Sequence, residues 1–120
     1  MLRVSCSDMN RPDSHDIAFG IAPRINAAGR IKHPLLALRV FEAAQSEAEA
    51  EESVGALSEM NQERRKLVAV HFEELAASIS GPIPAALVVY RESCPKGILG
   101  LLASKCVERW SVPAIVLAPS

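Results

Sequence analysis

A long stretch with a helix-type pattern occupies the middle of the chain. Ser46 followed by Glu49 is a capping-box signal, and no proline interrupts residues 46–79. Apolar residues recur at helical spacing along this stretch, and polar side chains cross the apolar stripe near its centre (Asn61, Arg64 and Arg65). The pattern predicts one continuous helix from about residue 46 to residue 79, with little tertiary cover at its centre.

This predicted helix is too long for the chain around it. At about 1.5 Å per residue it would measure about 50 Å. A compact chain of 120 residues has a radius of gyration of only about 14 Å. We therefore expect a connector whose two ends belong to two different domains.

The segment before this helix has weaker signals. Residues 1–16 mix polar residues and proline without periodicity, which is typical of a loop. Proline and glycine within residues 21–30 favour a shaped loop with room for one helical turn. Pro34 suits the first turn of a short helix, which should end near Ala44.

The pattern changes class after the long helix. Residues 80–82 read Ser-Gly-Pro and stop it, because glycine caps helix ends and proline cannot continue a helix. Apolar runs at residues 85–90 and 113–118 flank a stretch of helical spacing at residues 97–110. Strands that are apolar on both faces are typical of parallel sheets. The expected fold class is α/β, with a long connecting helix followed by the β-α-β start of a parallel or mixed sheet.

Composition narrows the class of protein. The chain has 120 residues, 49% of them apolar, and a formal net charge of -1, which fits one domain or parts of two without an overall basic field. Aromatic residues make up 4%, which disfavours base-stacking platforms. Three cysteines without Cys-x-x-Cys spacing indicate a reducing compartment. No apolar run reaches about 18 residues and no signal-type segment opens the chain, so we expect a cytoplasmic protein without membrane contact.

Residues 21–30 concentrate chemistry that suits a phosphate. Arg24 and Arg30 place guanidinium groups around an Ala-Ala-Gly segment whose small residues allow close backbone approach. This predicts a clamp for a phosphate end, with Asn26 holding the loop by hydrogen bonds from its side chain to the backbone. The alternative is a tight interdomain loop in which the arginines cap carbonyls or pair with carboxylates.

A second candidate lies at the start of the helix predicted over residues 97–110. Gly97 and Gly100 mark this start, and free N–H groups at a helix N-terminus attract anions. Lys96 and Ser104 are then candidate contacts to backbone phosphates. Close packing of the helix on a strand explains the two glycines equally well.

The basic cluster at residues 64–66 is typical of a solvated face that is balanced by Glu59 and Glu63 at helical spacing.

The Asp-Ser-His-Asp run at residues 13–16 offers the ligand types of a two-metal nuclease. Three ligands in one short loop favour helix capping by Asp13 or Ser14 instead. Cys94 has no histidine or acidic partner at a telling spacing, so a nucleophile is not indicated. We assign no metal ligand and no catalytic residue to this chain.

Three motifs in this order resemble one known family. Residues 23–30 are nearly identical to the Pro-Arg-(Ile/Leu)-Asn-Ala-Ala-Gly-Arg string of the RecJ single-stranded-DNA-specific exonucleases, members of the DHH phosphoesterase superfamily. Residues 57–66 are similar to the family's Leu-x-x-x-Asn-x-x-Arg-(x)-Lys helix segment. Residues 97–105, with the Pro-Ala-Ile-Val strand at 113–116, resemble the Gly-Val-x-Gly-Ile-Val-Ala-Ser-Arg stretch that opens the DHH-associated domain. The resemblance covers roughly residues 16–118.

The resemblance implies a domain organisation. Residues 1–45 would be the tail of the DHH domain, 46–80 the interdomain helix, and 81–120 the incomplete start of the DHH-associated domain. The manganese or magnesium ions of such enzymes would be held upstream, so the isolated chain is expected to bind no metal and to be inactive.

The resemblance also implies a function for the parent protein. It would be a metal-dependent 5′-to-3′ exonuclease acting on single-stranded DNA in repair and recombination, monomeric, with a single-strand-binding protein or a helicase as partners. The expected contacts to the 5′-phosphate or the DNA backbone are Arg24, Asn26, Arg30, Arg64, Lys96, Ser104 and Lys105. The alternatives are a DHH phosphodiesterase acting on short RNA or cyclic dinucleotides, and a non-catalytic nucleic-acid-binding module.

Two departures from the family pattern affect the second domain. Cys94-Pro95 stands where the family carries Trp-His, and Lys105 stands where it carries arginine.

Overall fold

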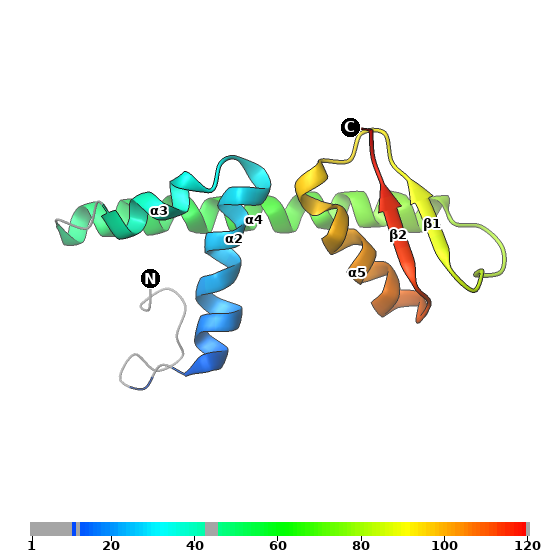
Figure 1. Cartoon of the computed structure of the whole chain (residues 1–120), viewed down its shortest axis with the longest axis horizontal. Coiled ribbons are helices and arrows are strands. Elements are labelled where there is room, and N and C mark those ends of the chain that lie inside the picture. Colours follow the sequence, from blue (N-terminus) through cyan, green and yellow to red (C-terminus); the bar gives the residue numbers. More distant parts are fainter. Residues whose placement is uncertain (1–10, 12, 43–45, 120) are drawn as a thin grey trace. The chain divides into compact units, whose positions relative to one another are not determined.

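The chain divides into two compact units, Met1–Arg64 and Arg65–Ser120, each with its own hydrophobic core. The structure is a computed structural model that describes residues 11, 13–42 and 46–119 (Figure 1). Within these residues, none of the helices combines the length and the apolar character that a membrane span requires.

The first unit is helical. A π-helix, η1 (Asp16–Ile21), runs directly into α2 (Ala22–Ile31), and α3 (Leu35–Glu42) follows after a short turn. The core of this unit joins α2 and α3 to the first half of α4 (Glu47–Ser78), and its buried residues are Ala27, Ala28, Ala37, Val40, Val54, Leu57 and Met60.

The prediction of a loop over residues 21–30 is wrong, because this segment is helix α2. Pro23 occupies the first turn of the helix, where a proline removes no hydrogen bond that the helix needs. Ala27 and Ala28 are strong helix formers and are completely buried. The expected loop over residues 1–16 lies mostly outside the described residues, as does the end of the helix predicted near Ala44.

The long helix is confirmed. Helix α4 is continuous from Glu47 to Ser78, and the Ser46 hydroxyl caps it by accepting a hydrogen bond from the Glu49 N–H at 3.2 Å. Its middle is more covered than expected, since Asn61 retains only 4% of its surface and Arg64 is half-buried. A polar residue in a helical stripe can therefore face the interior, which the hydrophobic pattern alone does not reveal.

The second unit confirms the α/β class. Strand β1 (Leu87–Tyr90) pairs in parallel with β2 (Ala114–Leu117), in the register Leu87↔Ala114 to Tyr90↔Leu117. The connection between them consists of a short 3₁₀ turn, η2 (Lys96–Ile98), and helix α5 (Leu99–Trp110). Both strands are shorter than predicted.

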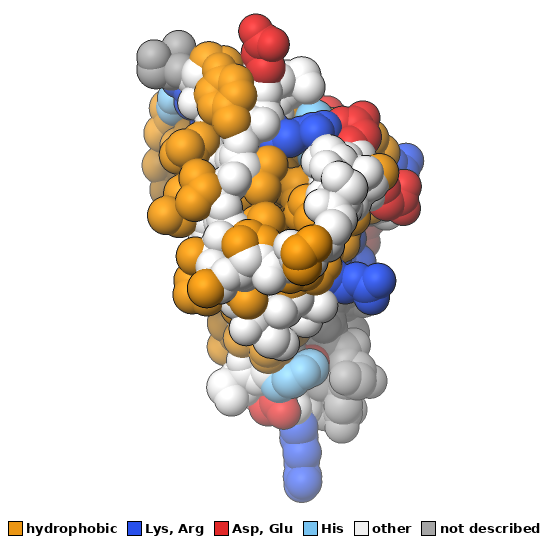
Figure 2. Space-filling view, turned by 90° about the vertical axis from the view of Figure 1, so that its right-hand side faces the viewer, with side chains coloured by type: hydrophobic (Ala, Val, Ile, Leu, Met, Phe, Trp, Pro, Cys, Tyr) orange, Lys and Arg blue, Asp and Glu red, His pale blue; other side chains and the backbone are white. Residues whose placement is uncertain are grey.

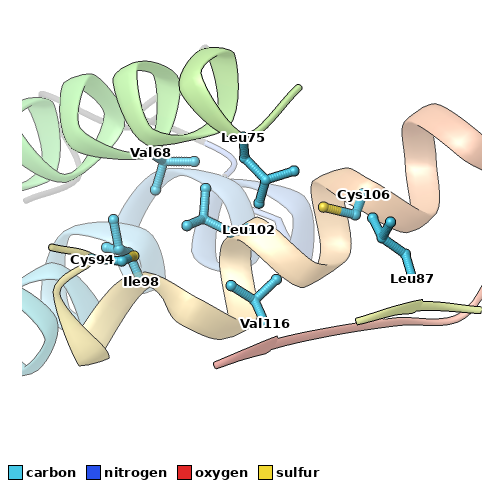
Figure 3. Packing of buried hydrophobic residues seen from close by; sticks show 8 residues of the cluster. All are labelled: Val68, Leu75, Leu87, Cys94, Ile98, Leu102, Cys106 and Val116. Atoms are coloured by element: carbon cyan, nitrogen blue, oxygen red, sulfur yellow. The ribbon is translucent and has the colours of Figure 1, made fainter. Parts of the chain in front are cut away.

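The core of the second unit lies between α4, α5 and the sheet. Figure 3 shows its side chains pointing into the space between α4 on one side and the strands on the other. The buried members are Val68, Leu75, Leu87, Cys94, Ile98, Leu102, Cys106 and Val116.

Only one face of the sheet is covered. The side chains on the other face are 47% to 64% exposed (Val88, Tyr90, Ile115 and Leu117). Figure 2 looks onto the side of the molecule that lies at the right of Figure 1, where β1 lies, and shows hydrophobic side chains across much of this surface. Both strands carry apolar residues on both faces, as their pattern predicted, and one face remains uncovered among the described residues, as expected for the incomplete start of a sheet.

Candidate nucleic-acid interface

Side-chain hydrogen bonds hold Arg24 within the first unit. Its Nε donates to the Ser58 hydroxyl of α4 at 3.2 Å, and its Nη1 donates to the carbonyl of Gly20. That carbonyl belongs to η1, in the turn before Pro23. Arg24 therefore caps a carbonyl, which is the structural role that the sequence analysis gave as the alternative to phosphate binding.

Asn26 and Arg30 lie on the exposed side of α2. They are four residues apart and therefore neighbours on one helix face, opposite the buried Ala27 and Ala28. The Asn26 side chain makes no hydrogen bond within the described part of the chain, so the expected bracing of a loop is not seen. The structure thus brings Asn26 and Arg30 together and turns Arg24 to a different side of the helix.

The start of α5 presents an open surface. A Cβ added at Gly100 would meet no atom within 4 Å, so close packing does not explain this glycine. Ser104, one turn later on the same face, is exposed and donates its hydroxyl to the Gly100 carbonyl at 3.0 Å. Lys96, in the turn before the helix, is also exposed. A small, polar strip with a cation at its N-terminal end suits the approach of an anion.

Lys105 has an aromatic neighbour. Its Nζ lies 5.4 Å from the centroid of the Phe72 ring of α4, and the Phe72 ring packs on Trp110 with centroids 5.9 Å apart. The separation from Phe72 is within the range of a cation–π interaction.

Arg64 sits at the end of the first unit, on α4. It is half-buried, whereas Arg65 and Lys66 are exposed. Asn61, one turn before Arg64, is buried, and its Oδ1 has no hydrogen-bond partner among the described residues.

Asp13, His15 and Asp16 bring potential metal-ligand atoms within 4.8 Å of one another. The Asp13 carboxylate accepts the Asp16 N–H at 2.9 Å, and the Asp16 carboxylate accepts the Asp13 N–H at 3.2 Å. This reciprocal pair is the geometry of a capping box, so the predicted capping by Asp13 is confirmed. The His15 ring lies against Phe19, with centroids 4.6 Å apart.

The two described cysteines are buried, and burial raises the pKa of each thiol. For Cys94 the positive charge of Arg91 opposes this effect in part. The pKa of Cys106 is raised by burial. Because the thiolate is the nucleophilic form, neither residue is activated for nucleophilic chemistry.

Two residues that contact candidate site residues were missed by the sequence analysis. Ser58 holds Arg24, and Phe72 lies under Lys105. Ser58 falls within the helix motif at residues 57–66, but nothing in the pattern connects it to a residue 34 positions away. Phe72 lies in the apolar stripe of the helix, and the pattern does not indicate that a cation lies over its ring.

Comparisons with known proteins give the class of the chain. No family model matches it. It is 33% identical over 119 residues to the single-stranded-DNA-specific exonuclease RecJ of Bacillus subtilis, a match that covers 98% of this chain and 15% of the relative. A crystal structure of RecJ in complex with Mg²⁺ from Thermus thermophilus matches with a TM-score of 0.78 at 33% identity, over 86% of this chain and 16% of that one. A structure of exonuclease RecJ bound to manganese matches with a TM-score of 0.75 at 32% identity, over 88% and 27% of the two chains.

These matches first define a class, proteins with the sequence and fold of DNA exonucleases. Within it, the relatives and structures that the chain matches are RecJ exonucleases, and its sequence and fold are similar to a segment of them, as the three motifs had indicated. It spans about 15% of the length of the Bacillus subtilis relative.

Proposed function

We propose that this chain is the interdomain and DNA-cleft segment of a metal-dependent, single-stranded-DNA-specific 5′-to-3′ exonuclease that acts in repair and recombination. The observation that carries the proposal is the match to RecJ along 98% of the chain, together with a shared fold at a TM-score of 0.78. In this proposal residues 1–45 end the DHH domain, 46–80 form the interdomain helix, and 81–120 begin the DHH-associated domain.

The described side chains support phosphate binding in each unit by itself. On α2, Arg30 supplies a guanidinium and Asn26 an amide on one exposed face, and Arg24 shapes the turn before them. On α5, the strip from Gly100 to Ser104 offers close approach, with cations from Lys96 and Lys105. Arg64, at the end of the first unit, is the further proposed backbone contact.

The metal centre of the parent enzyme is assigned to residues outside this chain. Divalent metal ions supply water activation and charge stabilisation in such hydrolases. Among the described residues, the one group with suitable ligand types is Asp13, His15 and Asp16, and both of its carboxylates are engaged in capping a helix. These residues do not fit a two-metal centre.

The test of the proposal is binding of a 5′-phosphorylated thymidine oligonucleotide by the whole 120-residue chain, followed by fluorescence anisotropy at moderate salt. Arg30→Gln should weaken binding by about tenfold or more, since a charge-assisted hydrogen bond contributes about 1.5–3 kcal/mol. Arg39→Gln is the matched control, because it removes the same charge from an exposed position on α3. Arg24→Gln should weaken binding and also lower the melting temperature, because it removes both hydrogen bonds to the turn and to α4.

Equal affinity losses in Arg30→Gln and Arg39→Gln would overturn the proposed contact between Arg30 of α2 and a phosphate. A matched uridine oligoribonucleotide is the second arm, and tighter binding of the RNA would favour the phosphodiesterase alternative. With Mn²⁺ present, the chain is expected to release no nucleotides from either oligonucleotide.

A further inference from the structure

Lys105 is placed differently from the other candidate cations. The Lys105 side chain is exposed, and no carboxylate pairs with it within the described ranges. Its ammonium instead lies over the Phe72 ring, 5.4 Å from the ring centroid. Phe72 comes from α4 and Lys105 from α5, and both belong to the second unit.

The ring under Lys105 is itself held in place. Phe72 is partly buried against the core of the second unit and packs on Trp110, with an angle of 43° between the ring planes. A ring fixed on two sides offers the ammonium a constant surface. The three N–H donors of an ammonium are not consumed by an aromatic face, so donors remain available to an anion on the solvent side.

A lysine at this position needs such support more than an arginine would. The lysine ammonium is a point charge on a flexible four-carbon stem, whereas the guanidinium of arginine is a rigid fork that binds phosphate in two places. Ordering a flexible lysine costs conformational free energy when it binds. An aromatic surface that restricts the stem before binding reduces this cost.

We propose that Phe72 is a positioning residue that holds the Lys105 ammonium for contact with a nucleic-acid phosphate. This inference rests on the proposed function, because Lys105 is one of its phosphate contacts. Phe72 does not touch the nucleic acid in this proposal and acts through Lys105 alone.

The first measurement needs no DNA, and its main result comes from the unaltered chain. In the NMR spectrum of the whole chain, the ε-methylene protons of Lys105 should be shifted upfield by the Phe72 ring and should return to ordinary values in Phe72→Leu. Ordinary values in the unaltered chain would overturn the positioning role even if a variant fails to fold.

The second measurement is a double-mutant cycle on binding of the 5′-phosphorylated thymidine oligonucleotide. Phe72→Leu should weaken binding by about two- to fivefold, the range of an exposed cation–π interaction. In a Lys105→Met background the same change should have no effect, and Phe72→Tyr, which keeps the aromatic face, should bind like the unaltered chain. The matched control is a second cycle that uses Arg109→Met in place of Lys105→Met. Arg109 is an exposed cation four residues later on α5, and in this cycle Phe72→Leu and Arg109→Met should act independently.

The outcomes separate the two proposals. Equal losses from Phe72→Leu with and without Lys105 would show a purely structural role and would overturn the inference, while the proposed function would stand. Failure of the unaltered chain to bind the oligonucleotide would overturn the proposed function, and the role of Phe72 with it.

Discussion

Ser111 ends α5 in a backbone conformation that favours glycine. Its φ of 55° and ψ of 32° lie in the left-handed region, and its N–H closes the helix on the Val107 carbonyl at 2.8 Å. Every L-residue with a Cβ is strained there, and glycine is the usual residue at this end of a helix. Ser111 therefore makes the second unit less stable than glycine at the same position would.

Replacement of this serine should stabilise the chain. We expect Ser111→Gly to raise the free energy of unfolding by about 0.5–1 kcal/mol, because relief of strain exceeds the added entropy of the unfolded chain. Urea denaturation followed by the fluorescence of Trp110, the single tryptophan, measures this. Ser111→Ala keeps the Cβ and is the control, and an equal gain in both variants would contradict the explanation.

The contacts of a single side chain could be predicted from the sequence where its partner lies a few residues away along the chain. The caps formed by Asp13 and Ser46 each involve a residue three positions away, so spacing alone reveals them. The partners of Arg24 and Lys105 come from other helices and depend on how helices pack. The sequence therefore supplies candidate residues for a phosphate site, whereas the positions of their side chains could not be predicted from it.

Helix α4 contains one glycine, and neither the backbone nor the packing around it requires a residue without a side chain. Gly55 lies in the interior of α4, is exposed, and has no atom within 4 Å of the place where a Cβ would be. Glycine in a helix interior costs about 0.5–1 kcal/mol relative to alanine. Its presence weakens the half of α4 that belongs to the first unit.

The corresponding prediction uses two neighbouring positions. Gly55→Ala should raise the free energy of unfolding by about 0.5–1 kcal/mol, and Ala56→Gly, at the exposed position beside it, should lower it by a similar amount. Circular dichroism at the helical signal, followed during thermal denaturation, measures both. A loss of stability in Gly55→Ala would contradict the prediction, because it would mean that the added Cβ meets a neighbouring atom.

Elements were predictable to the extent that their pattern is periodic and uninterrupted. The capping signal, the absence of proline and the Ser-Gly-Pro stop together define α4 within a residue or two at each end. The pattern does not reveal helix α2, because proline and glycine usually indicate a loop, although Pro23 in the first turn and Gly29 near the end are both compatible with a helix. The parallel β-α-β unit followed from two apolar runs around a helical stretch.

At the scale of the molecule, α4 contributes buried side chains to two separate cores. Leu57 and Met60 belong to the core of the first unit, and Val68 and Leu75 to the core of the second. The length of the predicted helix had indicated this division. The incomplete cover of the sheet was also to be expected, because a β-α-β unit has too few elements to cover both faces of its strands.

The uncovered sheet face carries apolar side chains in register. Val88 is paired with Ile115 and Tyr90 with Leu117, and all four are about half exposed or more. A two-stranded sheet also leaves unpaired backbone groups along both edges. Adjacent exposed apolar residues and open strand edges both favour association between copies of the chain.

We therefore expect the isolated chain to self-associate through this face, with an apparent mass that rises with concentration in sedimentation velocity. The double variant Val88→Thr and Ile115→Thr keeps residues that suit a strand but removes two apolar surfaces. It should weaken association by about tenfold or more, because each buried aliphatic side chain contributes about 1.5 kcal/mol. The control variant, Val70→Thr with Val107→Thr, makes comparable changes from a β-branched apolar residue to threonine at two exposed helix positions. If both double variants associate equally, then the sheet face is not the contact, and exposed apolar residues elsewhere on the chain drive the association.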